Sequence, residues 1–166
     1  MVLSEKDEIA IENQLGRVPR GVLKITNYTE DGEPLVILTD PILPDGKPFP
    51  TIFYLTHSRY VKAISRLEDK GLIKVFEQKV ISNKDLGEQF LGAQKSYINE
   101  RIRLAGDRLD KLNENERDIL EQTGIGGVRD LSTIKCLHAH YAHYLARKNN
   151  PIGKEIEKEL DEKSCN

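Results

Sequence analysis

The chain lacks the features that mark several specialised classes of protein. It has only two cysteines among its 166 residues, Cys136 and Cys165, and two thiols do not make a disulfide framework or a zinc finger. No apolar run approaches the roughly 20 residues that a membrane-spanning helix needs. The first residues also lack the basic and apolar regions of a signal peptide. The sequence therefore predicts a cytoplasmic protein.

The chain also has no excess of either charge. It carries 25 basic and 27 acidic residues, for a formal net charge of -2. Such a balance does not attract a protein to nucleic acid or to anionic lipid, so we expect no nucleic-acid partner and no membrane partner. Any site for an anion must therefore be a local feature of the fold.

The length and the distribution of apolar residues predict a single α+β domain. A chain of this size with 38% apolar residues can bury one core. Its first third has the alternation and the turn residues of strands, and the rest has helical periodicity. We expect a small antiparallel sheet from the N-terminal third, packed against a C-terminal set of helices. The expected domain covers residues 1–153, and residues 154–166 are expected to form a weakly ordered C-terminal tail.

The expected elements follow from turn and capping residues. Strands are predicted at 21–28, 35–39 and 51–56, with turns at 30–33 and 44–46. Helices are predicted from the start of the chain to Gly16, from a cap at Ser58 to Gly71, from Leu72 to about 80, from Asn83 or Asp85 to about Leu104, from about 115 to 122, and through the histidine-rich segment to Asn149.

The histidine-rich segment is the strongest local sign of chemistry. Three of the four histidines stand within KCLHAHYAHYLA, residues 135–146, beside Cys136. A helix through this segment places Cys136, His140 and His143 on one face, at i, i+4 and i+7. His138 points to another face of that helix. The segment is therefore a candidate site, but its pattern does not name a reaction.

Five blocks along the chain together resemble a known bacterial family, domain of unknown function 501 (DUF501). The blocks are QLGRVPRG (14–21), LPDGKPFPTIFYLT (43–56), GIGGVRD (124–130), KCLHAHYAHYLA (135–146) and NPIG (150–153). The resemblance implies no established activity. In some bacteria members of the family are encoded near an exopolyphosphatase and a septum-formation protein. Many members carry cysteines in the first hairpin turn, where this chain has TEDG at residues 29–32.

One interpretation is an anion site at the glycine-rich turn. A glycine turn that leads into a helix exposes backbone N–H groups at the positive end of the helix dipole. Gly124, Gly126 and Gly127 would form this turn, with Gly126 and Gly127 as ligand contacts, and the basic side chains expected around it are those of Arg17, Arg20, Arg129 and Lys135. The block matches neither a P-loop nor a dinucleotide fingerprint. The alternative is a helix C-cap at Gly124 followed by an ordinary turn.

A second interpretation is a metal site. Cysteine and histidine are ligands that zinc prefers, and the candidate ligands are Cys136, His140 and His143. Coordination of one ion by residues at i, i+4 and i+7 strains the geometry, so we expect no bound metal and do not favour zinc. The alternative is that these residues pack in the core. A Cys136–His140 nucleophile is a weaker hypothesis, because such partners normally come from different elements.

The sequence favours a protein that binds a small molecule with a phosphate or another oxyanion, or an enzyme that acts on such a molecule. The pocket would lie at the glycine-rich turn and the histidine helix, with His138 and His143 as acid–base groups. Two alternatives stay open: a non-catalytic interaction protein with a structural Cys/His helix, and a metal-dependent hydrolase. The sequence leaves the reaction, the cofactor and the oligomeric state undetermined.

Overall fold

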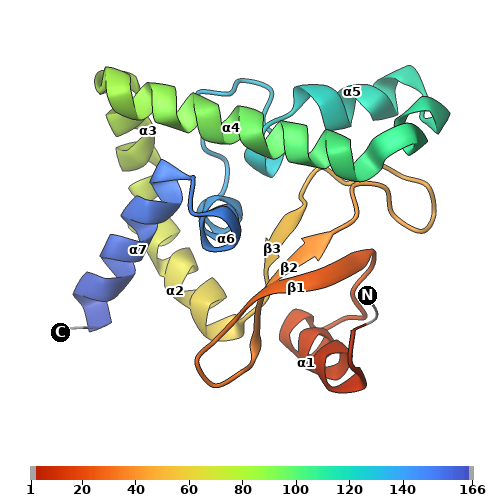
Figure 1. The fold of residues 1–166 in the computed structure, drawn as a ribbon. Coiled ribbons are helices and arrows are strands. Elements are labelled where there is room, and N and C mark those ends of the chain that lie inside the picture. Colours follow the sequence, from red (N-terminus) through yellow and green to blue (C-terminus); the bar gives the residue numbers. More distant parts are fainter. Residues whose placement is uncertain (1–2, 165–166) are drawn as a thin grey trace.

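A computed structural model describes residues 3–164 and has the expected α+β architecture. Helices surround a three-stranded sheet, and the long helix α4 crosses one side of the molecule (Figure 1). No helix in the described range is both long and apolar enough to cross a bilayer. The elements are α1 (Glu5–Leu15), β1 (Val22–Tyr28), β2 (Pro34–Thr39), β3 (Phe53–Leu55), α2 (Ser58–Asp69), α3 (Leu72–Ser82), α4 (Lys84–Ala105), α5 (Glu114–Gln122), α6 (Leu137–Arg147) and α7 (Pro151–Ser164), with short 3₁₀ turns at Gly106–Lys111 and Ile125–Gly127.

The sheet is antiparallel in the order β1-β2-β3, and helices cover both of its faces. Ile37 of β2 pairs with Ile25 and Tyr54, and this row packs against Ile11 of α1. On the opposite face, side chains such as Phe53 join the main core with residues of α6. This double cover explains why every residue of β2 is buried. Strand β3 therefore lies directly against α6.

The turn chemistry expected from the sequence is present. Gly32 closes the first hairpin with a φ of 80°, which is a left-handed conformation that favours glycine. In the next loop the backbone N–H of Lys47 donates to Asp45 Oδ1. The side chain of Asn83 caps α4 by accepting from Leu86 N. The expected cap at Ser58 is wrong, because Ser58 is the first residue of α2 and His57 is the cap residue.

Helix α6 begins later than the periodicity predicts. Cys136 is extended, with φ -149° and ψ 125°, and the helix starts at Leu137. The carboxylate of Glu68 on α2 accepts from Leu137 N at 2.8 Å and so satisfies the start of the helix from a distant element. Lys135 and Cys136 therefore precede the helix, and the glycine-rich turn does not lead directly into it.

Helix α7 replaces most of the expected tail. The side-chain oxygen of Asn150 accepts from Ile152 N and Gly153 N and caps this helix. Ile152 and Ile156 are fully buried in the main core. In the structure the helix continues through the expected tail to Ser164, and its apolar residues have the spacing of one helix face. Cys165 lies outside the described residues.

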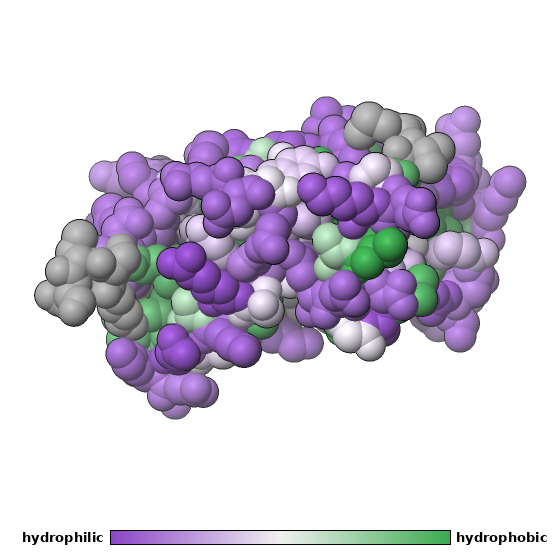
Figure 2. Space-filling model, turned by 90° about the horizontal axis from the view of Figure 1, so that it is seen from below, coloured by the Kyte–Doolittle hydropathy of each residue, from purple (hydrophilic) through white to green (hydrophobic). Residues whose placement is uncertain are grey.

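The face of the molecule in Figure 2 is mainly hydrophilic. Figure 2 shows one face, on which apolar side chains form small areas separated by polar ones. The large apolar side chains that are exposed within the described range are scattered over several elements, at Ile9, Val18, Tyr28, Val75, Ile81 and Leu91.

Candidate functional site

His140 and His143 belong to the core of the protein. Both are fully buried, and both Nδ1 atoms accept from Asn150 Nδ2, at 3.0 Å and 3.2 Å respectively. Burial lowers the pKa of His140 to about 3, with a further contribution from His143. Burial and the charge of Arg147 lower the pKa of His143 to about 4. Both imidazoles are neutral at pH 7 and connect α6 to the start of α7.

The buried position of His143 corrects two expectations from the sequence. His143 does not line the main pocket as an acid–base group would. The proposed metal set of Cys136, His140 and His143 does not form either, because Cys136 is not on the helix that carries the two histidines. Among the described residues, the side chains that do come together with metal-ligand spacing are those of Glu68, Cys136 and His138.

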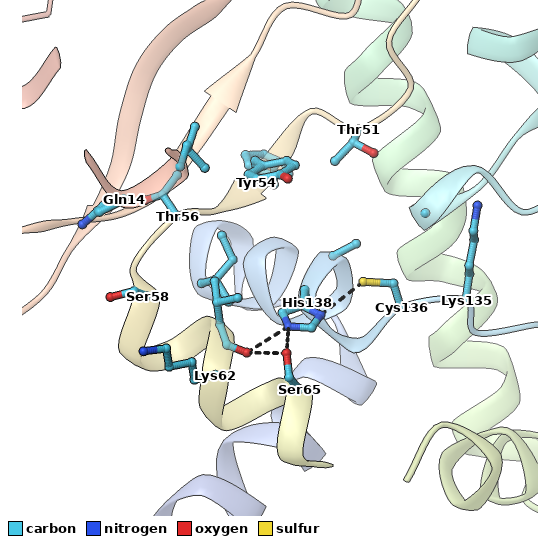
Figure 3. Close-up of a pocket in the computed structure, with 16 residues that line it drawn as sticks. Gln14, Thr51, Tyr54, Thr56, Ser58, Lys62, Ser65, Lys135, Cys136 and His138 are labelled. Carbon is cyan, nitrogen blue, oxygen red and sulfur yellow. Dashed lines mark hydrogen bonds between the residues drawn. The ribbon is translucent and has the colours of Figure 1, made fainter. Parts of the chain in front are cut away.

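The main pocket lies between β3, α2 and the start of α6 (Figure 3). Its volume is about 590 Å³, which is typical of sites for small molecules. Cys136 and His138 line it at the start of α6, and residues of α2 such as Ser65 line it directly beside His138. The lining residues are Gln14, Leu15, Thr51, Phe53, Tyr54, Leu55, Thr56, Ser58, Val61, Lys62, Ser65, Gly126, Lys135, Cys136, His138 and Ala139.

His138 is held in place by α2. Its Nε2 lies 3.0 Å from the carbonyl oxygen of Val61 and 3.2 Å from Ser65 Oγ. Because a carbonyl oxygen only accepts, Nε2 carries a proton. Ser65 Oγ donates to the same Val61 oxygen at 2.9 Å. These contacts fix the ring so that Nδ1 faces Cys136 and Glu68.

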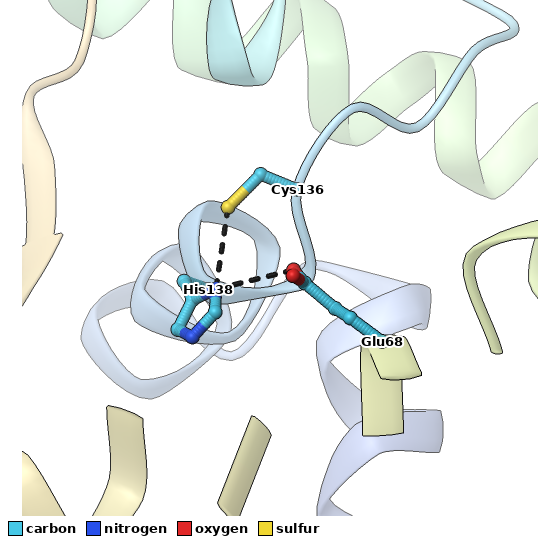
Figure 4. A group of neighbouring side chains, drawn as sticks. All are labelled: Glu68, Cys136 and His138. Carbon is cyan, nitrogen blue, oxygen red and sulfur yellow. Dashed lines mark hydrogen bonds and ion pairs between the residues drawn. The ribbon is translucent and has the colours of Figure 1, made fainter. Parts of the chain in front are cut away.

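The other edge of the ring contacts two acidic groups (Figure 4). Nδ1 lies 3.5 Å from Cys136 Sγ and 3.1 Å from Glu68 Oε1. Burial opposes a charge on the ring. The hydrogen bonds to Cys136 and to the Val61 carbonyl, with the charges of Cys136 and Glu68, outweigh burial and raise the pKa of His138 to about 9. In the absence of other ligands the ring is therefore an imidazolium at pH 7.

The structure separates the residues of the expected anion site. Lys135 and Gly126 line the pocket beside His138. Arg20 instead pairs with Asp45 at 2.8 Å, and Arg129 pairs with Asp118 at 2.6 Å. Neither of these arginines lines the pocket, and Arg17 and Gly127 do not line it either. The expected convergence of four basic residues is thus reduced to Lys135.

The glycine-rich turn is held by two buried side chains of α4. Arg101 is fully buried and donates to the carbonyl oxygens of Leu120, Thr123 and Gly124, and also to that of Pro50. Gln94 accepts from Ile125 N at 2.7 Å. A Cβ at Gly124 would collide with Gln94, which explains the glycine at that position. Much of the polar backbone of this turn therefore has a structural role.

Several residues of the site carry no signal in the sequence. Glu68 and Lys62 look like ordinary polar positions of an amphipathic helix, and Ser65 does too. Glu68 contacts His138 although the two are 70 residues apart. Only the packing of α2 against α6 brings them together.

A comparison with known families identifies the chain. A family model described as "protein of unknown function (DUF501)" matches residues 25–158. The chain belongs to this family. The matched range includes the pocket residues Lys62, Lys135, Cys136 and His138, and also Glu68, which contacts His138. No curated protein and no solved structure matches the chain.

Proposed function

We propose that this DUF501 protein binds a small anionic molecule, with a phosphate or another oxyanion, in the pocket between β3, α2 and α6. The observation that carries this proposal is the charge of the lining: Lys62 and Lys135 contribute to it, and none of the lining residues is Asp or Glu. In a chain with a net charge of -2, such a pocket is a local exception.

The placement of the two lysines supports binding of an anion. They lie on opposite sides of His138 in Figure 3. Within residues 3–164, neither lysine forms an ion pair, whereas Arg20 and Arg129 each have an acidic partner. Lysine side chains that are free of such partners are available to a phosphate or carboxylate.

The rest of the lining supports a ligand with both a polar and an apolar part. Hydroxyl groups of Thr51 and Ser58 are available for hydrogen bonds, and Phe53 and Val61 add apolar surface. Cys136 and His138 place a thiol and an imidazole at the same cavity, so the proposal extends to an enzyme acting on the bound molecule. A cytoplasmic location fits this role, since a reducing compartment keeps such a thiol free.

An interaction protein without a ligand has less support. Docking surfaces usually present a contiguous apolar patch. The face in Figure 2 has only small separate apolar areas, and the exposed apolar residues of the described chain are scattered. We therefore place the proposed role in the pocket.

The test is ligand-dependent thermal unfolding with inorganic phosphate, pyrophosphate, citrate and a set of sugar phosphates. A compound that binds only the folded state adds about 2.7 kcal/mol to the free energy of unfolding when its concentration is a hundredfold above its Kd. Lys62→Gln and Lys135→Gln should each reduce the rise in Tm that the ligand causes. Lys95→Gln is the matched control, because Lys95 is an exposed lysine that does not line the pocket. Equal shifts in all three variants would exclude this site.

A further inference from the structure

We propose that Glu68, Cys136 and His138 form a site for one zinc ion whose fourth coordination position faces the pocket. The three donor atoms are Glu68 Oε1, Cys136 Sγ and His138 Nδ1, and all lie within 4.8 Å of one another (Figure 4). Glu68 stands in the last turn of α2, while Cys136 and His138 stand at the start of α6. The site thus joins two separate elements.

The distances between the donors suit a tetrahedral zinc ion. Bonds of about 2.3 Å to sulfur and about 2.1 Å to nitrogen and oxygen place sulfur and nitrogen about 3.6 Å apart and nitrogen and oxygen about 3.4 Å apart. The observed separations are 3.5 Å for Sγ to Nδ1 and 3.1 Å for Nδ1 to Oε1. These two distances need change only by a few tenths of an ångström to accept the ion.

The backbone at Cys136 makes this arrangement possible. Residues at i and i+2 of one helix do not face each other. Cys136 is extended and precedes the helix, whereas His138 is within it, so their side chains can converge. The sequence pattern places Cys136 inside the helix and therefore suggests the wrong histidines.

The surroundings of the donors are those of metal ligands. A histidine that binds a metal through one nitrogen usually donates its other N–H to a carbonyl or carboxylate. Here Nε2 of His138 faces the Val61 carbonyl, which directs the lone pair of the neutral ring to Nδ1. The Glu68 oxygen is in turn fixed by Leu137 N. Both ligands are thus oriented before any ion arrives.

The donor set favours zinc over magnesium or calcium. A thiolate and an imidazole are soft or borderline ligands that suit Zn²⁺, whereas Mg²⁺ and Ca²⁺ prefer oxygen. A thiolate, a carboxylate and a neutral imidazole also balance the charge of a divalent ion. Zinc sites with three protein ligands and one open position are typical of catalysis.

The open position links this site to the pocket. Cys136 and His138 both line the cavity, so a ligand atom or a water molecule can reach an ion held by them. This link between ion and ligand rests on the proposed function, in which the anionic group would bind between the ion and the two lysines. It makes hydrolysis assisted by a metal the first class of reaction to test.

The experiment uses the full chain, stripped with a chelator and titrated with Co²⁺ as a spectroscopic probe and with Zn²⁺ in competition. We expect one equivalent to bind and a thiolate-to-cobalt charge-transfer band to appear. Cys136→Ser should abolish the band, and His138→Gln and Glu68→Gln should weaken binding by more than about tenfold. Glu68→Gln keeps an oxygen for Leu137 N, so it tests coordination while preserving the start of α6.

Two controls make the result specific. Cys165→Ser should keep the band, which assigns it to Cys136. His57→Gln should keep full affinity, because His57 forms a similarly close pair with Glu33, at 2.7 Å, without a thiol. A Cys165→Ser protein without the band, or unchanged affinity in all three site variants, would overturn the proposal. Lys62→Gln should not change the cobalt spectrum, so failure of anion binding is distinguishable from failure of the metal site.

Discussion

Cys136 Sγ lies 3.5 Å from Nδ1 of His138, and this contact exists because the first residue is extended and the second is helical. The contact lies at the wall of the cavity rather than in the core. A thiol with an imidazole beside it is accessible to small reagents there, and the two lysines of the pocket should affect which reagents reach it.

The charge of the pocket predicts the reactivity of Cys136. In the metal-free protein, the ratio of the alkylation rates with iodoacetate and iodoacetamide should be higher at Cys136 than at Cys165, because Lys62 and Lys135 attract the anionic reagent. The rates follow from mass spectrometry of the two cysteine peptides. Lys62→Gln and Lys135→Gln should lower the ratio at Cys136, and Lys95→Gln should not. If neither lysine substitution changes the ratio at Cys136, the lysines do not attract the anionic reagent as proposed.

His143 should behave as a core residue. His143→Ala removes a buried ring that packs against Phe53 and Tyr97 and accepts from Asn150. The Asn150 amide loses this acceptor, which should lower the free energy of unfolding by about 1–3 kcal/mol, and the cavity should lower it further. Urea unfolding measures the change, with His57→Ala as the reference variant. A His143→Ala protein as stable as the wild type would favour the site role that the sequence suggests.

The fold should lose stability in acid through its buried histidines. The pKa of each ring falls from about 6.5 in the unfolded chain to about 3 in folded His140 and about 4 in folded His143. Because the folded state keeps them neutral, their contribution is present above pH 6.5 and is lost as pH falls toward the folded pKa values. When the pH falls from 7 to 5.5, His140 and His143 together should lower the free energy of unfolding by about 2–3 kcal/mol.

Unfolding in urea across this pH range tests the linkage. His143→Gln removes one titrating group and should reduce the acid-dependent loss by about 1 kcal/mol. A pH dependence that stays the same in His143→Gln would show that other groups cause it.

The expected elements are largely right because local chemistry determines them. The first hairpin has its glycine turn at Gly32, and the long helix begins at its Asn83 cap. The start of α6 is different. The periodic spacing of apolar and histidine residues extends back to Cys136, but the carboxylate of Glu68, 69 residues away, satisfies the helix at Leu137. A single sequence gives no sign of that partner.

The candidate site could be predicted only in part. Of the residues that the sequence nominates as site residues, Lys135, His138 and Gly126 line the pocket, and Cys136 lines it beside them. The helical period places His138 on another face than His140 and His143, and Asn150 holds the latter two in the core. Arg20 and Arg129 do not line this pocket, and each pairs with a carboxylate instead.

The buried cation of Arg101 should be essential to the loops beside the site. Its guanidinium donates to four carbonyl oxygens, which lysine cannot reach together. Arg101→Met should destabilise the fold by at least about 3 kcal/mol, since buried acceptors are left unsatisfied. In Arg101→Lys, hydrogen exchange should accelerate in residues 120–128 more than in α7. If hydrogen exchange in that variant is no faster in residues 120–128 than in α7, Arg101 does not hold the turn.

The most direct measurement is a crystal structure of the protein purified without chelator and grown with zinc, with data collected on both sides of the zinc absorption edge. We expect one anomalous peak within bonding distance of Glu68, Cys136 and His138, with an oxygen ligand from the pocket completing the coordination. An unoccupied centre between these three residues, with zinc bound elsewhere on the surface or not at all, would contradict it.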